Sequence, residues 1–181
     1  MPRTPSKKVR AKKPVKRLQG IDKLVHNKKP ILEDVNKIMV SINKMIVPAK
    51  TLSEAKKAYE THPAELVKSG KIPVIFGKEG GANYGCYQAC GVLYEALKKL
   101  GLKPRLSRQL HGEMPHTKVF FSLKGELYEV EMFFNLSANK VTKERLAHIK
   151  KEMREGKFKF IEPGSITYTE FKRQKRTGKK K

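Results

Sequence analysis

Three residues in the middle of the chain have the types that a cysteine-nucleophile acyl-transfer site needs: Cys86, His116 and Glu131. A thiol attacks a carbonyl carbon only as its thiolate, so such a cysteine needs a lowered pKa and a nearby imidazole. The imidazole in turn needs a carboxylate that fixes its tautomer and holds the ring in place. These types predict acyl transfer or amide hydrolysis, with Cys86 as nucleophile, His116 as general base and acid, and Glu131 as orienting group.

Cys86 is expected in the first turn of a helix. A glycine-rich loop over residues 77–83 precedes it, and apolar residues then recur at three- and four-residue intervals as far as Leu100. Unpaired backbone N–H groups at a helix N-terminus lower the pKa of a thiol and can stabilise an oxyanion. Tyr84 and Gly85, which directly precede the nucleophile, are therefore candidates for the oxyanion site or the cleft wall.

His116 and Glu131 are expected on the two strands of one hairpin. Period-two patterns over residues 117–123 and 126–134 are separated by Lys124-Gly125, which is typical of a tight turn. Antiparallel pairing then sets the start of the first strand beside the end of the second, and so His116 beside Glu131. Glu129 lies on the same strand face as Glu131 and is the rival carboxylate.

Other interpretations of the same residues stay open. Cys86 could be a small buried hydrophobe, as Cys90 is expected to be one helical turn later. His111 is a competing imidazole. Cys86, Cys90, His111 and His116 also contain two pairs of zinc-ligand types, but structural cysteine pairs usually sit on turns and the interval is longer than in a zinc finger. The loop after Gly77 lacks the Gly-Lys-Ser/Thr ending of a phosphate loop, so neither a metal nor another cofactor is expected.

The run YGCYQACGVLYEALKKLGLKPR resembles the signature of the transglutaminase-like superfamily. In that family a nucleophilic cysteine opens a helix that leads to a Leu-Gly turn and an arginine. Cys86, Gly91, Leu100-Gly101 and Arg105 fall in register with this signature. The following HTKVFFSLKGELYEVE is similar to the family's histidine strand, short turn and second strand ending in Asp.

The resemblance covers about residues 72–135 and departs from the family pattern at identifiable places. Glu131 stands where Asp is usual, Thr117 stands where an aromatic residue is usual, and the chain has no Trp. The resemblance implies a papain-like α+β core and a thioester at Cys86. The acyl group would come from a protein or peptide amide and pass to water or to an amine.

The net charge of +24 is concentrated at the two ends of the chain. Residues 1–30 hold 11 Lys and Arg against one acid and residues 138–181 hold 15 against 5, whereas residues 31–137 hold 15 against 11. Basic arms bind polyanions by releasing condensed counterions. Nucleic acid or another polyanion is therefore the expected partner, and the candidate contacts are Lys7, Lys8, Arg10, Lys12, Lys13, Lys16, Arg17, Lys172, Arg173, Lys175 and Arg176.

One α+β domain is expected over residues 31–171, between a disordered basic arm (1–30) and a basic tail (172–181). It divides into a helical lead-in (31–70), a catalytic core (71–135) and a helix with strands (136–171). The lead-in has an amphipathic helix over residues 31–47 and two short helices after it. The last part has a helix over 142–155, a strand around Phe158 and Phe160, a turn at Pro163-Gly164, and a final strand holding Ile166, Tyr168 and Phe171.

The same composition gives expectations about location. No apolar run approaches the roughly 18 residues of a membrane span, and the N-terminus lacks a secretory signal. Two cysteines four residues apart in one helix argue against a disulfide framework. The protein is expected inside the cell, in the nucleus or in a nucleoprotein particle such as a virion. The second functional hypothesis is a catalytically inactive transglutaminase-like scaffold that acts as a structural nucleic-acid-binding component.

Overall fold

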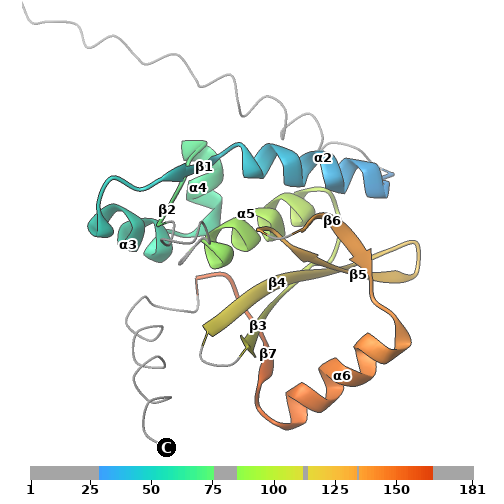
Figure 1. Ribbon diagram of the computed structural model, residues 1–181. Helices are drawn as coiled ribbons and strands as arrows, with labels where there is room; N and C mark the ends of the chain where they lie inside the picture. The colour runs from blue at the N-terminus through green and yellow to red at the C-terminus, as the bar shows by residue number, and fades with distance from the viewer. Residues whose placement is uncertain (1–28, 76–84, 112–113, 134, 165–181) are drawn as a thin grey trace, which may run out of the picture.

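The computed structural model describes residues 29–75, 85–111, 114–133 and 135–164 (Figure 1). Within these ranges the fold is mixed α+β, with five helices, a five-stranded antiparallel sheet and a two-stranded parallel sheet. The expected α+β class is therefore confirmed.

Three helices form the lead-in, as the periodicity predicted: α2 (Leu32–Asn43), α3 (Leu52–Glu60) and α4 (Pro63–Ser69). Thr51 caps α3 by accepting a hydrogen bond from Glu54 N at 3.1 Å, and Pro63 occupies the first turn of α4. The expected first helix is shorter than its apolar pattern. It ends at Asn43 because the next apolar residues form β1 (Ile46–Pro48), which pairs in parallel with β2 (Ile72–Val74).

The five-stranded sheet has the order β6-β5-β4-β3-β7. Its strands are β3 (Arg105–His111), β4 (Met114–Leu123), β5 (Glu126–Glu131), β6 (Asn135–Lys140) and β7 (Phe158–Ile161). The predicted hairpin is β4 and β5, and its turn has positive φ at both Lys124 (52°) and Gly125 (80°), as a tight hairpin turn requires. β7 and the turn at 163–164 were also predicted, whereas β3 and β6 were not; the expected strand over 166–171 lies outside the described residues.

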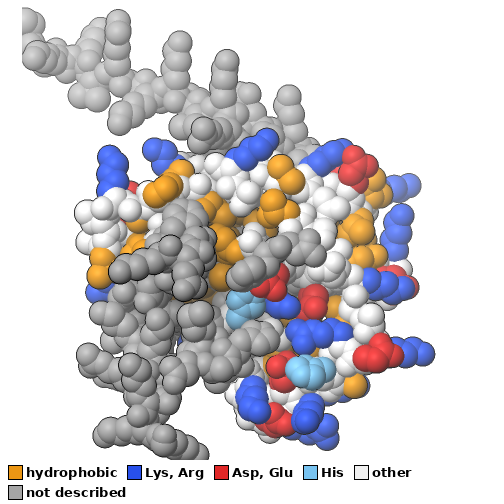
Figure 2. Space-filling model, in the orientation of Figure 1, with side chains coloured by type: hydrophobic (Ala, Val, Ile, Leu, Met, Phe, Trp, Pro, Cys, Tyr) orange, Lys and Arg blue, Asp and Glu red, His pale blue; other side chains and the backbone are white. Residues whose placement is uncertain are grey.

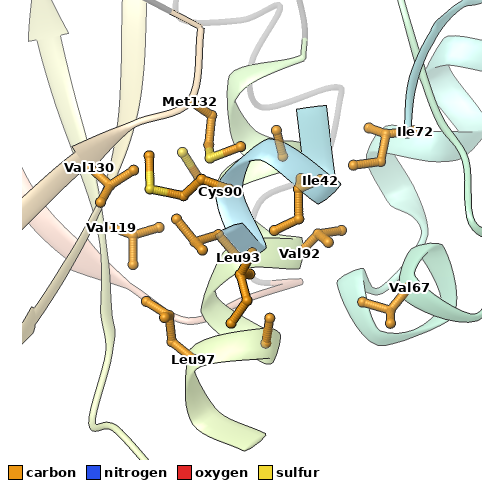
Figure 3. Packing of buried hydrophobic residues seen from close by; sticks show 14 of the residues in the cluster. Ile42, Val67, Ile72, Cys90, Val92, Leu93, Leu97, Val119, Val130 and Met132 are labelled. Carbon is orange, nitrogen blue, oxygen red and sulfur yellow. The ribbon is translucent and has the colours of Figure 1, made fainter. Parts of the chain in front are cut away.

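The sheet separates two apolar clusters. Helix α5 (Cys86–Lys99) and α2 cover one face, and α6 (Lys143–Arg154) lies on the other (Figure 1). Val119 and Val130 project toward α5 (Figure 3), and with Phe121 they join the large core. Phe120 projects to the opposite side, where it packs with Ile149 and Phe158. We refer to these two sides as the α5 face and the α6 face.

Candidate active site

The start of α5 is built around a glycine. Gly85 is the N-cap residue, its carbonyl accepts a hydrogen bond from Ala89 N at 3.0 Å, and it is buried. A Cβ at this position would lie 2.7 Å from both Val74 Cγ1 and Phe133 Cζ. Position 85 therefore needs glycine so that the helix start can pack closely against β2 and Phe133. Tyr84, the other candidate beside the nucleophile, lies outside the described residues.

Cys86 opens α5, as predicted, and its side chain is half-buried. Burial raises the pKa of the Cys86 thiol to about 12, and the charge of Glu131 adds to the increase, while backbone hydrogen bonding at Cys86 itself acts in the opposite direction. The sequence led us to expect a lowered pKa, and that expectation was wrong for this structure. Loss of solvent outweighs the stabilisation that the helix N-terminus gives to a thiolate. Cys86 is thus a protonated thiol at neutral pH.

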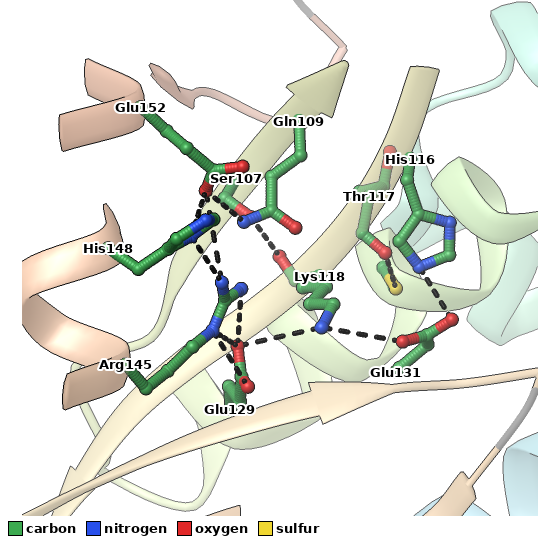
Figure 4. Close-up of polar contacts among 11 residues, drawn as sticks. Ser107, Gln109, His116, Thr117, Lys118, Glu129, Glu131, Arg145, His148 and Glu152 are labelled. Atoms are coloured by element: carbon green, nitrogen blue, oxygen red, sulfur yellow. Dashed lines mark hydrogen bonds and ion pairs between the residues drawn. The ribbon is translucent and has the colours of Figure 1, made fainter. Parts of the chain in front are cut away.

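His116 and Glu131 lie against each other, as the hairpin pairing predicted (Figure 4). His116 Nε2 is 2.7 Å from Glu131 Oε1, and the two side chains are only 14% and 23% exposed. The contact is an ion pair only when the imidazole is protonated. Because the pair is largely shielded from water, the attraction between a protonated imidazole and the carboxylate is stronger than it would be at the surface.

The rival carboxylate has a different partner. Arg145 from α6 binds Glu129 through Nε, 3.2 Å from each carboxylate oxygen, and through Nη2, 3.1 Å from Oε2. Such a forked contact between guanidinium and carboxylate is strong and specific. Glu129 is therefore bound by a side chain of α6, and Glu131 is the carboxylate that contacts the imidazole.

Glu131 acts on both of the other predicted residues. It contacts His116 directly, and its charge adds to the rise in the pKa of the Cys86 thiol. Cys90, one helical turn after Cys86, is fully buried in the apolar core (Figure 3), and its Sγ donates a hydrogen bond to Thr117 O at 3.2 Å. The prediction that Cys90 is a core residue is confirmed.

Lys118 was not singled out from the sequence. Its Nζ lies 3.4 Å from Glu131 Oε2 and 3.6 Å from Glu129 Oε2 (Figure 4). The sequence did indicate Lys118 as a possible site residue, because a residue two positions after His116 on a strand projects to the same face of the sheet.

The remaining candidates are placed as follows. His111 is the last residue of β3, paired with Met114, and its side chain lies outside the described part. Among the described residues, no group of three or more His, Cys, Asp or Glu could hold a metal ion. None of the helices in the described ranges is long and apolar enough to cross a membrane. All eleven predicted nucleic-acid contacts in the two arms lie outside the described residues.

Searches of family models, curated proteins and solved structures return no match for this chain.

Proposed function

We propose that this protein performs cysteine-dependent acyl transfer or amide hydrolysis through Cys86, His116 and Glu131, on a transglutaminase-like (papain-like) domain. One observation carries the proposal: His116 and Glu131 are in contact at 2.7 Å, and the same carboxylate is electrostatically coupled to a cysteine at a helix start. The order of helix-borne thiol, strand-borne imidazole and strand-borne acid along the chain also supports it. The substrate class is a protein or peptide amide.

The proposed reaction needs a group that takes the proton from Cys86. Since the pKa of Cys86 is raised to about 12, a base must take its proton as the sulfur attacks the carbonyl carbon. In the proposed mechanism neutral His116 keeps its ring proton on Nε2, which faces Glu131, and accepts the thiol proton at Nδ1; the carboxylate then stabilises the resulting imidazolium. Backbone N–H groups at the start of α5 would stabilise the oxyanion.

The second half of the reaction uses the same imidazole. The imidazolium returns its proton to the leaving amine nitrogen as the C–N bond breaks, which leaves a thioester on Cys86. Water or a second amine then attacks the thioester carbonyl, and His116 accepts a proton from that nucleophile. Breakage of the C–S bond releases the acyl product and returns the proton to Cys86.

A second candidate function is the catalytically inactive scaffold. The observation that favours it is the raised pKa of Cys86, because a half-buried thiol that stays protonated is a poor nucleophile. In this case the domain would serve only to hold nucleic-acid-binding arms.

Glu131→Gln separates the two functions because they predict opposite signs. In an active site the substitution removes the group that orients His116, so alkylation of Cys86 by iodoacetamide at neutral pH should slow by at least about tenfold. In an inert scaffold the substitution removes a charge that raises the pKa of Cys86, so alkylation should become faster. Mass spectrometry of the labelled peptides gives both rates, with Cys90 as the internal reference.

Glu126→Gln is the matched control. It removes a carboxylate from the same strand, where Glu126 is half exposed and pairs with Lys140 at 3.0 Å. It should leave Cys86 labelling unchanged. His116→Ala should abolish the excess reactivity of Cys86 over Cys90. Equal, slow labelling of both thiols in the unmodified protein would overturn the proposal that the protein is an enzyme.

We further propose that the basic arms localise the domain to nucleic acid, in the nucleus or in a nucleoprotein particle such as a virion. Helix α6 adds to their charge: Lys143, Lys150 and Arg154 are exposed, lie on one helical stripe, and have no ion-pair partner in the part of the chain that the structure describes. Figure 2 shows Lys and Arg side chains spread over this side of the molecule. Phosphate backbones are the ligands that such a surface suits.

The salt dependence of the affinity for nucleic acid tests whether the basic arms bind phosphates. The affinity for duplex DNA and for RNA, measured by fluorescence anisotropy, should fall steeply as salt rises, with a slope of about 0.9 per neutralised phosphate for duplex DNA. Removal of residues 1–30 and 172–181 should flatten the slope. An affinity that does not change with salt would contradict this part of the proposal.

A further inference from the structure

A row of charged side chains on the α6 face ends at the His116–Glu131 pair (Figure 4). From the pair outward, this charged row consists of Lys118, Glu129, Arg145, Glu152 and His148. Lys118 stands between the two carboxylates of β5, and its side chain is only 14% exposed. A lysine so shielded from water is costly unless its charge is matched, so its contacts here are specific.

The two carboxylates share Lys118 unequally. Arg145 already binds both oxygens of Glu129 at 3.1 to 3.2 Å. Lys118 Nζ is nearer to Glu131 Oε2, at 3.4 Å, than to Glu129 Oε2, at 3.6 Å. Glu129 thus has its own cation, and the charge of Lys118 is available to Glu131.

We propose that Lys118 is a positioning residue that binds one oxygen of Glu131 and thereby holds the other oxygen against His116. The proposal rests on the proposed function, since it concerns the same site. A glutamate has one more rotatable bond than an aspartate, so a single contact through Oε1 leaves its carboxylate free to turn. A second contact through Oε2 removes that freedom, which explains how a glutamate serves where the resembled family has an aspartate.

Lys118 also has an electrostatic effect on the imidazole. Glu131 from β5 contacts His116 directly, and its charge also acts on the Cys86 thiol of α5. The charged groups that continue the row from Glu131 are Lys118 from β4, Glu129 from β5, and Arg145, Glu152 and His148 from α6. β3 places Gln109 opposite His116, and Arg108 projects to the other face of the sheet. Loss of the lysine charge leaves the negative charge of Glu131 less compensated, which favours the protonated imidazole.

Nuclear magnetic resonance titration of His116 in the full chain tests the proposal. Lys118→Met should raise the midpoint of the His116 titration by about one pH unit. Lys118→Arg, which keeps the charge, should restore the midpoint to within about 0.3 pH units of the unmodified protein. Lys140→Met is the control, because it removes the same charge from the same sheet at an exposed pair with Glu126. An unchanged midpoint in Lys118→Met, or an equal shift in Lys140→Met, would overturn the proposal.

Glu129→Gln keeps the proposal testable if Lys118→Met does not fold. This variant retains Lys118 and removes the second carboxylate that shares it. The midpoint of His116 should then move down, opposite in sign to the effect of Lys118→Met. A midpoint that stays or rises in Glu129→Gln would count against the role given to Lys118.

The pH profile of Cys86 alkylation separates this proposal from the proposed function. If both hold, the acidic limb of the profile moves up in Lys118→Met together with the His116 midpoint, and the rate at neutral pH falls about three- to tenfold. A shifted His116 midpoint with no change in Cys86 alkylation would overturn the proposed function and leave the contact of Lys118 with Glu131 standing. An unshifted His116 midpoint, together with Cys86 alkylation that depends on His116, would overturn the role given to Lys118 and leave the proposed function standing.

Discussion

The two faces of the five-stranded sheet differ in what they contribute, although the same strands build both. On the α5 face, Val119 and Val130 are fully buried among apolar neighbours. On the α6 face, the same two strands present Lys118, Glu129 and Glu131 in a row of ion pairs. One face therefore holds the fold together through apolar packing, whereas the other orients charged side chains beside His116 and Glu131.

The largest expected effect is loss of packing on the α5 face. Leu93 is fully buried in the large core, so Leu93→Ala should lower the free energy of unfolding by about 3 to 4 kcal/mol. Leu146 lies on α6 and is 39% exposed, so Leu146→Ala should cost less than about 1 kcal/mol. Urea unfolding of both variants measures the difference, and equal costs would mean that the two faces are not as unlike as their burial indicates.

The next effect lies in the charged row. Arg145→Met leaves Glu129 largely shielded with Lys118, 3.6 Å away, as its remaining ion-pair partner among the described residues, and should destabilise the protein by about 1 to 3 kcal/mol. Lys37→Met removes an exposed pair with Glu33 and should not change the melting temperature measurably. If Arg145→Met also left the melting temperature unchanged, the Arg145–Glu129 contact of the charged row would contribute nothing to the stability of the fold.

Alkaline pH should weaken the α5 face through its thiols. The pKa of Cys86 is raised from 9.0 to about 12 and that of Cys90 is raised well above 9.0, both chiefly by burial. Above pH 9 the unfolded chain therefore releases protons that the folded chain retains, and stability falls as pH rises, approaching about 1.4 kcal/mol per pH unit for each thiol. Denaturant unfolding between pH 8 and about 10.5 should show a shallower decline in Cys86→Ala than in the unmodified protein; identical slopes would contradict the burial of Cys86.

The smallest expected effect is at the turn that joins β4 to β5 and belongs to neither face. Lys124 has φ of 52°, a conformation that asparagine adopts more easily than lysine. Lys124→Asn should stabilise the protein by up to about 1 kcal/mol, measured as a higher urea midpoint. It should leave both Cys86 labelling and the His116 titration unchanged, and a change in either would show that the hairpin turn affects the site.

Sequence periodicity predicted the elements whose apolar residues face one core. Helices α2 to α6 and the β4–β5 hairpin were all expected near their observed positions. β3 was missed because three consecutive residues in it are polar although they are buried on one face or the other: Ser107 and Gln109 are fully buried and Arg108 nearly so. β6 was missed because the edge strand NLSANK has no alternating apolar pattern. The end of α2 was misplaced because only the pairing of β1 with β2 distinguishes a strand there from a longer helix.

The candidate site was predicted in part for similar reasons. Hairpin register was enough to bring His116 beside Glu131, since a short turn fixes which residues oppose each other. The choice between Glu131 and Glu129 depended on Arg145, which approaches from α6 and which no local pattern reveals. The raised pKa of Cys86 depends on how fully the folded chain covers the thiol, a property of tertiary packing alone.

Tyr87, the residue after Cys86, ties the end of the described chain to the start of α5. Its hydroxyl accepts a hydrogen bond from Gly164 N at 2.7 Å, and its ring packs 5.0 Å from that of Tyr59. The segment that follows edge strand β7 is therefore fastened to the helical turn that carries the thiol. Local opening of β7 should loosen this turn as part of one cooperative unit, so amide hydrogen exchange at Cys90 and Gly91 should rise and fall with that of Phe160.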